Sequence, residues 1–240
     1  SNKGIALANG ICPASPGDDP YWTAVAAIDE AIRNVVCVGG DPRRTAILDN
    51  FCWGNCDNPE TMGALVRACQ ACYDAAMAYE VPFISGKDSL NNEFALDPAD
   101  AKRLAARMPL ANNRIRIPET LLISAVSIVE DVNKCVTMDA KTGQPTSFYF
   151  VGLRAAKWEE VKLQHAANLH AALFKLLNRN PSERSIMAVH DCGSEGIMPA
   201  LAEMAFAGGC GVDGYTPENG EFADPFAPVP CGYIVQVTDE

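Results

Sequence analysis

The chain has 240 residues, of which 48% are hydrophobic and 20% charged, and its formal net charge is -11 at pH 7. These proportions are ordinary for a globular protein, and the length suffices for one large domain or two small ones. The acidic balance argues against binding to nucleic acid or to an anionic membrane, since both would repel the chain. No apolar stretch approaches the ~18 to 20 residues of a membrane span, and no signal peptide is evident, so we expect a cytoplasmic protein.

The ten cysteines are spread along the chain, unlike those of a small disulfide-rich domain. Four of them have roughly the spacing of a zinc site, namely Cys52, Cys56, Cys69 and Cys72. Cys69 and Cys72 also belong to the apolar side of a helical pattern, where cysteine packs as a small hydrophobic residue. The other members of that side are Leu65, Val66, Tyr73 and Met77. The pattern favours core cysteines and leaves a zinc site as the alternative.

The first part of the chain predicts two successive helix and strand pairs. Asp19 can cap a helix that begins at Pro20 and runs to about residue 36. The strand "TAILDN", residues 45–50, then ends in polar residues. A second helix is predicted over residues 59–80, followed by the strand "VPFIS" and a polar loop "GKDS". If the two strands are neighbours, their polar ends belong to one site.

The remaining elements predict a second α+β half. Residues 95–116 look helical or loose, and "TLLISAVSIV" is a long strand, with a possible short one at residues 136–138. A strand "SFYFVGL", a helix over residues 156–178, a strand "SIMAVHD", a helix over residues 198–207 and a strand "GYIVQV" follow. We therefore expect a boundary near residue 145.

Two places offer residues with metal or proton chemistry. Glu30 and Asn34 stand four apart on one helix face, and their oxygens suit Mg²⁺; a solvated surface pair is the alternative. His190 ends a strand and could be a general base or metal ligand, or a histidine satisfied within a packed turn. His165 and His170 lie in the long helix as structural or solvated residues. Because no P-loop, dinucleotide fingerprint or nucleophile elbow stands where it would be needed, any ATP site follows another scheme.

Four ordered segments carry a family resemblance: "DPYWTAVAAIDEAIRNVVCVGGDPRRTAILDNFCWGN", "PFISGKDSLNNEF", "IPETLLISAVSIVEDV" and "HDCGSEGIMPALAEMAFAGG". Together they resemble the second half of the synthetase subunits of the phosphoribosylformylglycinamidine synthase family, in the aminoimidazole ribonucleotide synthetase-like superfamily. The resemblance implies an α+β fold, with an N-terminal-type domain over residues 1–145 and an incomplete C-terminal-type domain over residues 146–240.

The resemblance also implies a reaction of purine biosynthesis. In the family, ATP phosphorylates the amide oxygen of formylglycinamide ribonucleotide, and ammonia displaces the phosphate to give the amidine. Mg²⁺ offsets the phosphate charge, as an acidic protein requires. The implied partners are a glutaminase domain or subunit that supplies ammonia, and the missing first copy of the synthetase. Since N-terminal-type domains of the superfamily pair through their sheets, the isolated chain is expected to self-associate.

Site residues follow from the same resemblance, position by position. Asp49 and Gly86 match nucleotide-binding positions, Lys87 is placed to meet phosphate, and Ser89 matches a serine that contacts substrate. A further set resembles the magnesium ligands of a second, non-catalytic nucleotide site, namely Glu30, Asn34 and Asp191. No catalytic residue is assigned, because the family's catalytic histidines belong to the first copy. The chain alone is therefore expected to be inactive.

The sequence departs from the family at two places. The Gly/Ser-rich segment that usually follows the counterpart of "YFVG" is absent, since "VGLRAAKWEEVKLQ" passes directly to helix. The glycine of "HDCGSEGIM" is also shifted. Two alternatives stay open: another ATP-using member of the superfamily, and a non-catalytic nucleotide-binding or scaffold module.

Overall fold

A four-stranded sheet forms the centre of the first half of the protein. The computed structural model describes residues 2–107, 110, 112–153, 155–213 and 224–239. The sheet has the order β1-β6-β2-β3, made of Gly4–Pro13, Thr120–Val129, Thr45–Cys52 and Phe83–Ser89. β2 and β3 are parallel, whereas β6 is antiparallel to both β1 and β2. The two strands predicted to carry polar residues are therefore neighbours.

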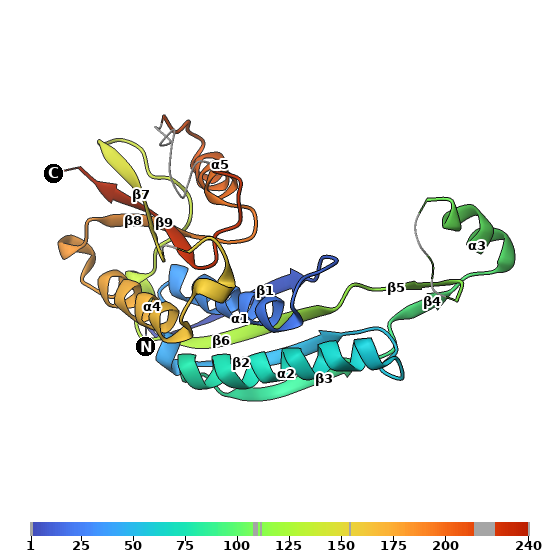
Figure 1. Cartoon of the computed structure of the whole chain (residues 1–240). Helices are drawn as coiled ribbons and strands as arrows, with labels where there is room; N and C mark the ends of the chain where they lie inside the picture. Colours follow the sequence, from blue (N-terminus) through green and yellow to red (C-terminus); the bar gives the residue numbers. More distant parts are fainter. Residues whose placement is uncertain (1, 108–109, 111, 154, 214–223, 240) are drawn as a thin grey trace.

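Two long helices cover one face of this sheet, as Figure 1 shows for α2. α1 spans Pro20–Cys37 and α2 spans Pro59–Tyr79, each with proline at its start. The Asp19 side chain accepts a hydrogen bond from Tyr21 N, and Asn58 caps α2 in the same way. α1 lies so close to β1 that a Cβ on Gly10 would be 2.1 Å from the carbonyl oxygen of Ala27. The predicted helix starts are confirmed, and the close packing requires glycine.

The other face of the sheet is open and partly apolar. Alternate side chains of β1 point to it, and Ile5, Leu7 and Ile11 are 66%, 78% and 48% exposed. Neither α1 nor α2 covers them, because both helices pack against the buried residues of the opposite face. A contiguous apolar face of this kind is typical of a surface that meets a partner.

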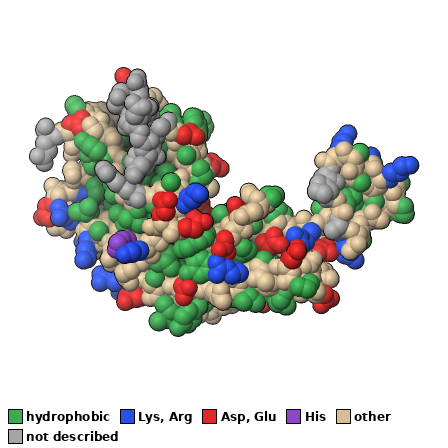
Figure 2. Space-filling view, in the orientation of Figure 1, with side chains coloured by type: hydrophobic (Ala, Val, Ile, Leu, Met, Phe, Trp, Pro, Cys, Tyr) green, Lys and Arg blue, Asp and Glu red, His purple; other side chains and the backbone are tan. Residues whose placement is uncertain are grey.

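The described residues between positions 93 and 116 form an arm that extends away from the body (Figure 1). The arm pairs β4 (Glu93–Ala95) with β5 (Arg114–Arg116) and carries α3 (Pro98–Ala105) at its tip. Figure 2 shows basic side chains on it, and α3 contributes Lys102 and Arg103. The predicted helical excursion is thus present, but the two short strands were missed, since three residues are too few to show an alternating pattern.

A second sheet forms the later half. Its order is β7-β9-β8, made of Thr146–Gly152, Gly232–Thr238 and Ile186–Cys192, and both pairs are antiparallel. α4 (Leu163–Leu177) and α5 (Ile197–Gly208) pack beside it (Figure 1). The helix predicted from residue 156 begins later because Trp158–Glu160 forms the short 3-10 helix η3. The short strand at residues 136–138 is only an isolated bridge between Thr137 and Ala188.

The hydrophobic core does not stop between the two sheets. The largest described cluster of buried residues joins α1, α2 and the first sheet to Val161, Ala166 and Cys231 of the later half. Smaller clusters lie between the second sheet and its neighbouring helices, and one of them includes Val36 and Cys37 of α1. The two halves therefore share one packed interior. No helix among the described residues is long and apolar enough to cross a membrane.

The predicted apolar side of α2 is confirmed only in part, since Leu65 and Cys72 pack against the large core cluster. The buried residues of the helix are mainly small, whereas Val66, Tyr73 and Met77 are 50%, 68% and 64% exposed, and Cys69 is exposed too. The alanines let α2 approach its neighbours closely, which the larger side chains would prevent. The four-cysteine zinc site is not formed. Among the described residues, the one group of three or more Cys, His, Asp or Glu residues whose ligand atoms all lie within 4.8 Å of one another is Asp29, His170 and Cys231.

Candidate nucleotide and cation sites

Asp49 and Gly86 lie side by side on β2 and β3. They are register partners, and a Cβ on Gly86 would be 2.4 Å from both carboxylate oxygens of Asp49. Only glycine leaves room for the carboxylate there. The sequence predicted that the polar segment after Ser85 is a loop, and this prediction is wrong. β3 continues through Ser89 in parallel pairing with β2.

The polar residues of β2 and β3 divide between the two faces of the sheet. Asp49 and Asp88 share the face covered by α2, and burial together with Asp88 raises the pKa of Asp49. Lys87 and Ser89 alternate to the open face, where Lys87 Nζ contacts Ser89 Oγ. The structure therefore brings Asp49 to Gly86 and Lys87 to Ser89, but it separates the two pairs.

A second group forms where α1 meets the end of β8. A Cβ on Gly193 would be 4.0 Å from Glu30 Oε1, 3.9 Å from Asp191 Oδ2 and 2.9 Å from Arg33 Nη2. Three charged side chains from distant parts of the chain thus surround one point. This arrangement joins Glu30 and Asp191, which the sequence placed in one metal-binding set.

Glu30 is held by the backbone of β1. Its Oε2 accepts a hydrogen bond from Ile11 N at 2.7 Å. Burial raises the pKa of Glu30 and the nearby Asp191 carboxylate adds to the shift, so a cation beside Glu30 would favour its ionised form. Asn34, one helical turn further along, donates from Nδ2 to Asn9 O at 3.2 Å, which ties this amide to β1.

Arg33 is the functional neighbour that the sequence reasoning missed. Its guanidinium is buried, ion-paired with Asp29, and 3.8 Å from Asp191 Oδ2. Burial opposes its charge, but Asp29 and Asp191 outweigh this and raise the pKa of Arg33. The signal was available, because Asp29 and Arg33 stand four apart on the apolar face of α1, where charged residues need partners.

Asp29 is the centre of a buried polar network. It accepts a hydrogen bond from Tyr79 Oη at 2.8 Å and is 2.9 Å from His170 Nε2; His170 Nδ1 is 2.6 Å from Tyr233 Oη. Burial disfavours its charge, but His170 and Arg33 outweigh this and lower the pKa of Asp29. Because its oxygens already have these partners, the group of Asp29, His170 and Cys231 is structural. His170 is thus a structural histidine.

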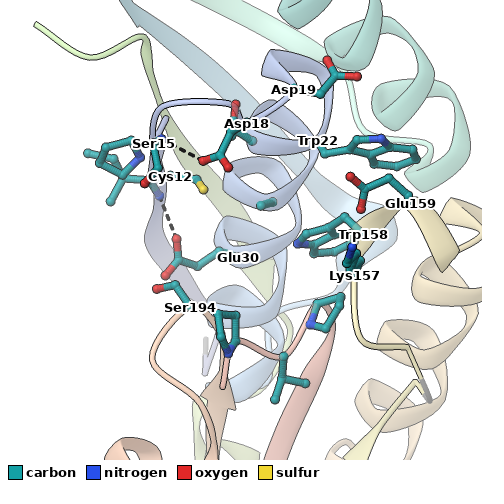
Figure 3. Close-up of a pocket in the computed structure, with 18 of the residues that line it drawn as sticks. Cys12, Ser15, Asp18, Asp19, Trp22, Glu30, Lys157, Trp158, Glu159 and Ser194 are labelled. Carbon is teal, nitrogen blue, oxygen red and sulfur yellow. Dashed lines mark hydrogen bonds between the residues drawn. The ribbon is translucent and has the colours of Figure 1, made fainter. Parts of the chain in front are cut away.

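A cavity of about 530 Å³ adjoins Glu30 (Figure 3). It lies between the end of β1, the first turns of α1, residues 156–159 and the segments around Gly193 and Pro230. This volume lies within the range of small-molecule sites. A second cavity of about 230 Å³ shares Glu30 and contains Asp191 and His190.

His190 has partners on both ring nitrogens. Nε2 is 2.7 Å from Glu203 Oε2, and Nδ1 is 3.1 Å from Asp191 Oδ1. Burial acts against protonation, but Asp191 and Glu203 outweigh it and raise the pKa of His190. Of the roles open from the sequence, the geometry agrees with a satisfied, ion-paired histidine.

Comparison with known proteins shows what the chain is similar to. Residues 2–99 match the family described as AIR synthase related protein, N-terminal domain. The phosphoribosylformylglycinamidine synthase subunit PurL of Rhodopseudomonas palustris (strain BisB18) is 31% identical over 221 residues, which cover 87% of this chain and 27% of the relative. The chain thus spans about a quarter of the length of this curated relative.

Solved structures share the fold at low sequence identity. Thermotoga maritima PurL complexed with FGAR has a TM-score of 0.68 at 14% identity, over 98% of this chain and 38% of that one. PurLQS from the same organism has a TM-score of 0.64 at 20% identity, over 99% and 32%. T. maritima PurL complexed with ATP has a TM-score of 0.63 at 20% identity, over 100% and 33%. Residues 2–99 thus match the AIR synthase related N-terminal domain, and the chain is similar in sequence and in fold to part of the synthase subunit PurL.

Proposed function

We propose that the chain is part of an ATP-dependent synthetase of purine biosynthesis. The reaction converts formylglycinamide ribonucleotide and glutamine-derived ammonia to formylglycinamidine ribonucleotide, ADP and phosphate. The match of residues 2–99 to the AIR synthase related N-terminal domain and the similarity to PurL support this assignment, as does the fold shared with T. maritima PurL complexed with FGAR and with ATP. Because the chain matches only 27% of its relative, further segments are required, and we expect the chain alone to be inactive.

The observation that carries the proposal is that Glu30 and Asp191 both lie within 4.0 Å of the point where a Cβ on Gly193 would stand; Glu30 lines both cavities and Asp191 lines the smaller one. Carboxylate oxygens are donors that Mg²⁺ takes in proteins, so Glu30 and Asp191 fit this ion. Asn34 is proposed as a further ligand through its amide oxygen, but it lines neither cavity, and its Nδ2 donates to Asn9 O. When bound, Mg²⁺ would neutralise the charge of nucleotide phosphates. Arg33, itself fixed by Asp29, holds Asp191 by charge attraction at 3.8 Å.

The β2 and β3 residues are proposed to serve the catalytic site from the two faces of the sheet. Asp49 and Gly86 would approach ATP, Lys87 a phosphate, and Ser89 the substrate. Lys87 and Ser89 point to the open sheet face, so the first copy of the synthetase, docked on this face, would complete the site. A glutaminase domain or subunit would supply ammonia, and the assembly would work in the cytoplasm. In this scheme residues 1–145 and 146–240 are the N-terminal-type and C-terminal-type domains.

A second candidate function is a non-catalytic nucleotide-binding module. One observation favours it, because the cavity in Figure 3 is lined by Glu30 and not by Asp49. Under this alternative the chain holds a structural nucleotide and Mg²⁺ while other segments perform the chemistry.

Calorimetric titration with Mg·ADP tests the nucleotide site, after co-purified nucleotide has been removed. We expect Glu30→Gln to raise the Kd by roughly 10- to 100-fold, as the loss of a metal-site contact does. The matched control is Glu60→Gln, which changes an exposed glutamate at the start of α2. Wild-type affinity in Glu30→Gln, or no binding by the wild-type chain, would contradict the assignment.

The catalytic role is tested in the full-length enzyme. We expect Asp49→Ala to abolish amidine formation while leaving Mg·ADP binding by the isolated chain unchanged. Full turnover in that variant would leave only the non-catalytic function.

A further inference from the structure

The cavity beside Glu30 has two unlike sides (Figure 3). Glu30 and Ser194 lie on one side, whereas the indole rings of Trp22 and Trp158 lie on the other, with the Glu159 carboxylate drawn near both rings. The polar side contains Glu30, which is one of the proposed cation ligands. The aromatic side has no part in cation binding, and no role has yet been given to it.

Both tryptophans are half-buried, since each packs against the large core cluster on one edge and lines the cavity on another. The third tryptophan of the chain, Trp53, is 1% exposed and belongs to the core. The rings of Trp22 and Trp158 therefore remain partly accessible, and the accessible parts face the same cavity.

Trp22 is held in place before any ligand binds. Tyr21 meets it edge to face, with ring centroids 4.7 Å apart and planes at 78°. Tyr21 in turn donates from its hydroxyl to Asp74 Oδ2 at 2.7 Å and lies under the Arg67 guanidinium, 5.0 Å from the ring centroid. An aromatic surface fixed in this way loses little freedom when a flat ring stacks on it.

Trp158 reaches the cavity from the segment between β7 and α4. The short 3-10 helix η3, Trp158–Glu160, carries Trp158 to the cavity that Trp22 also lines. The same segment adds the charged side chains of Lys157 and Glu159 to the lining.

We propose that Trp22 and Trp158 bind the base of a nucleotide whose phosphates lie toward Glu30, Arg33 and Ser194. This inference rests on the proposed nucleotide site and adds the groups that recognise the base. The Glu159 carboxylate beside the two indole rings would repel a phosphate there, so the phosphate end belongs with Arg33 and the bound cation. The Glu159 carboxylate can accept a hydrogen bond from the amino group of adenine.

The test compares Mg·ADP with Mg·pyrophosphate, which has the phosphates without the base. By calorimetry, the wild-type chain should bind Mg·ADP more tightly than Mg·pyrophosphate. Trp22→Leu and Trp158→Leu should each weaken Mg·ADP roughly tenfold, which is typical of a lost base stack, and leave Mg·pyrophosphate unchanged. Trp22→Phe and Trp158→Phe, which keep an aromatic face, should retain most of the affinity.

Tryptophan fluorescence gives a second readout that does not require the leucine variants to fold. Mg·ADP should quench the wild-type emission, and each phenylalanine variant should lose part of the quenching because only Trp53 and one cavity tryptophan remain. Equal affinity for both ligands in the wild-type chain, or unchanged emission at saturation, would overturn the base-binding role and leave the cation and phosphate site standing. Failure of both ligands to bind would overturn the proposed nucleotide site and this inference with it.

Discussion

At the residue scale, Asp49 and Gly86 show how register makes a site. The sequence predicted that two strand ends meet, and the structure places these two residues opposite each other. It could not predict that Lys87 and Ser89 point to the other face, because the sequence indicated a loop after Ser85, whereas β3 continues through Ser89 and its side chains alternate between the two faces. The polar composition of this segment gives no sign of strand pairing, which depends on the neighbouring strand β2.

The raised pKa of Asp49 predicts a pH-dependent stability. Burial and Asp88 favour the protonated form in the folded protein. This contribution is present below the ordinary aspartate pKa of about 3.9 and is lost as the pH rises through the raised folded-state pKa. We therefore expect Asp49→Asn to raise the urea midpoint at pH 7, with the difference from wild type closing toward pH 4.

Asp57→Asn is the matched control for that experiment, since Asp57 is an exposed aspartate in the loop before α2. It should leave the midpoint unchanged at both pH values. A lower midpoint for Asp49→Asn at pH 7 would show that the carboxylate is stabilised by contacts other than those described.

At the element scale, the starts of the two long helices α1 and α2 could be predicted from the sequence. The buried face of α2 could be predicted only in part. Asp19-Pro20 and Asn58-Pro59 are local signals, and both caps form as expected. The buried side of α2 is made of alanines, and hydrophobic periodicity undervalues alanine beside tyrosine and methionine. The close approach of α2 to α1 decides the face, and that approach is a property of both helices together.

This packing predicts opposite responses to two substitutions in α2. Ala71 is fully buried, so Ala71→Leu should lower the free energy of unfolding by about 1–3 kcal/mol through overpacking. Met77 is 64% exposed, so Met77→Gln should change it by less than about 0.5 kcal/mol. Urea denaturation measures both. If Met77→Gln were the more harmful change, the orientation of α2 would be wrong.

At the scale of the whole molecule, the two halves are joined by the shared core and by the network around Asp29. The sequence indicated a boundary near residue 145, and the two main sheets lie on either side of it. The contact of Asp29 on α1 with His170 on α4 was not predictable, because partners so far apart in the chain are chosen by the packing of the halves. Glu30 and Asp191 meet for the same reason.

The open face of the first sheet predicts self-association of the isolated chain. Ile5, Leu7 and Ile11 expose apolar surface that a partner sheet would cover. We expect light scattering to show a mass that rises with protein concentration, and Leu7→Glu to reduce this rise by placing a charge on the face. Met77→Glu, which charges the outer side of α2, should leave it unchanged. A strictly monomeric wild-type mass at high concentration would contradict the prediction.

The location of the cation is the most direct test of the proposed nucleotide site. Crystals of the chain grown with Mn²⁺ and ADP would show the ion by its anomalous scattering. We expect one manganese peak between Glu30 and Asp191, with ADP in the adjoining cavity. A peak beside Asp49 and Gly86 instead, or an empty cavity at saturating ADP, would contradict the account.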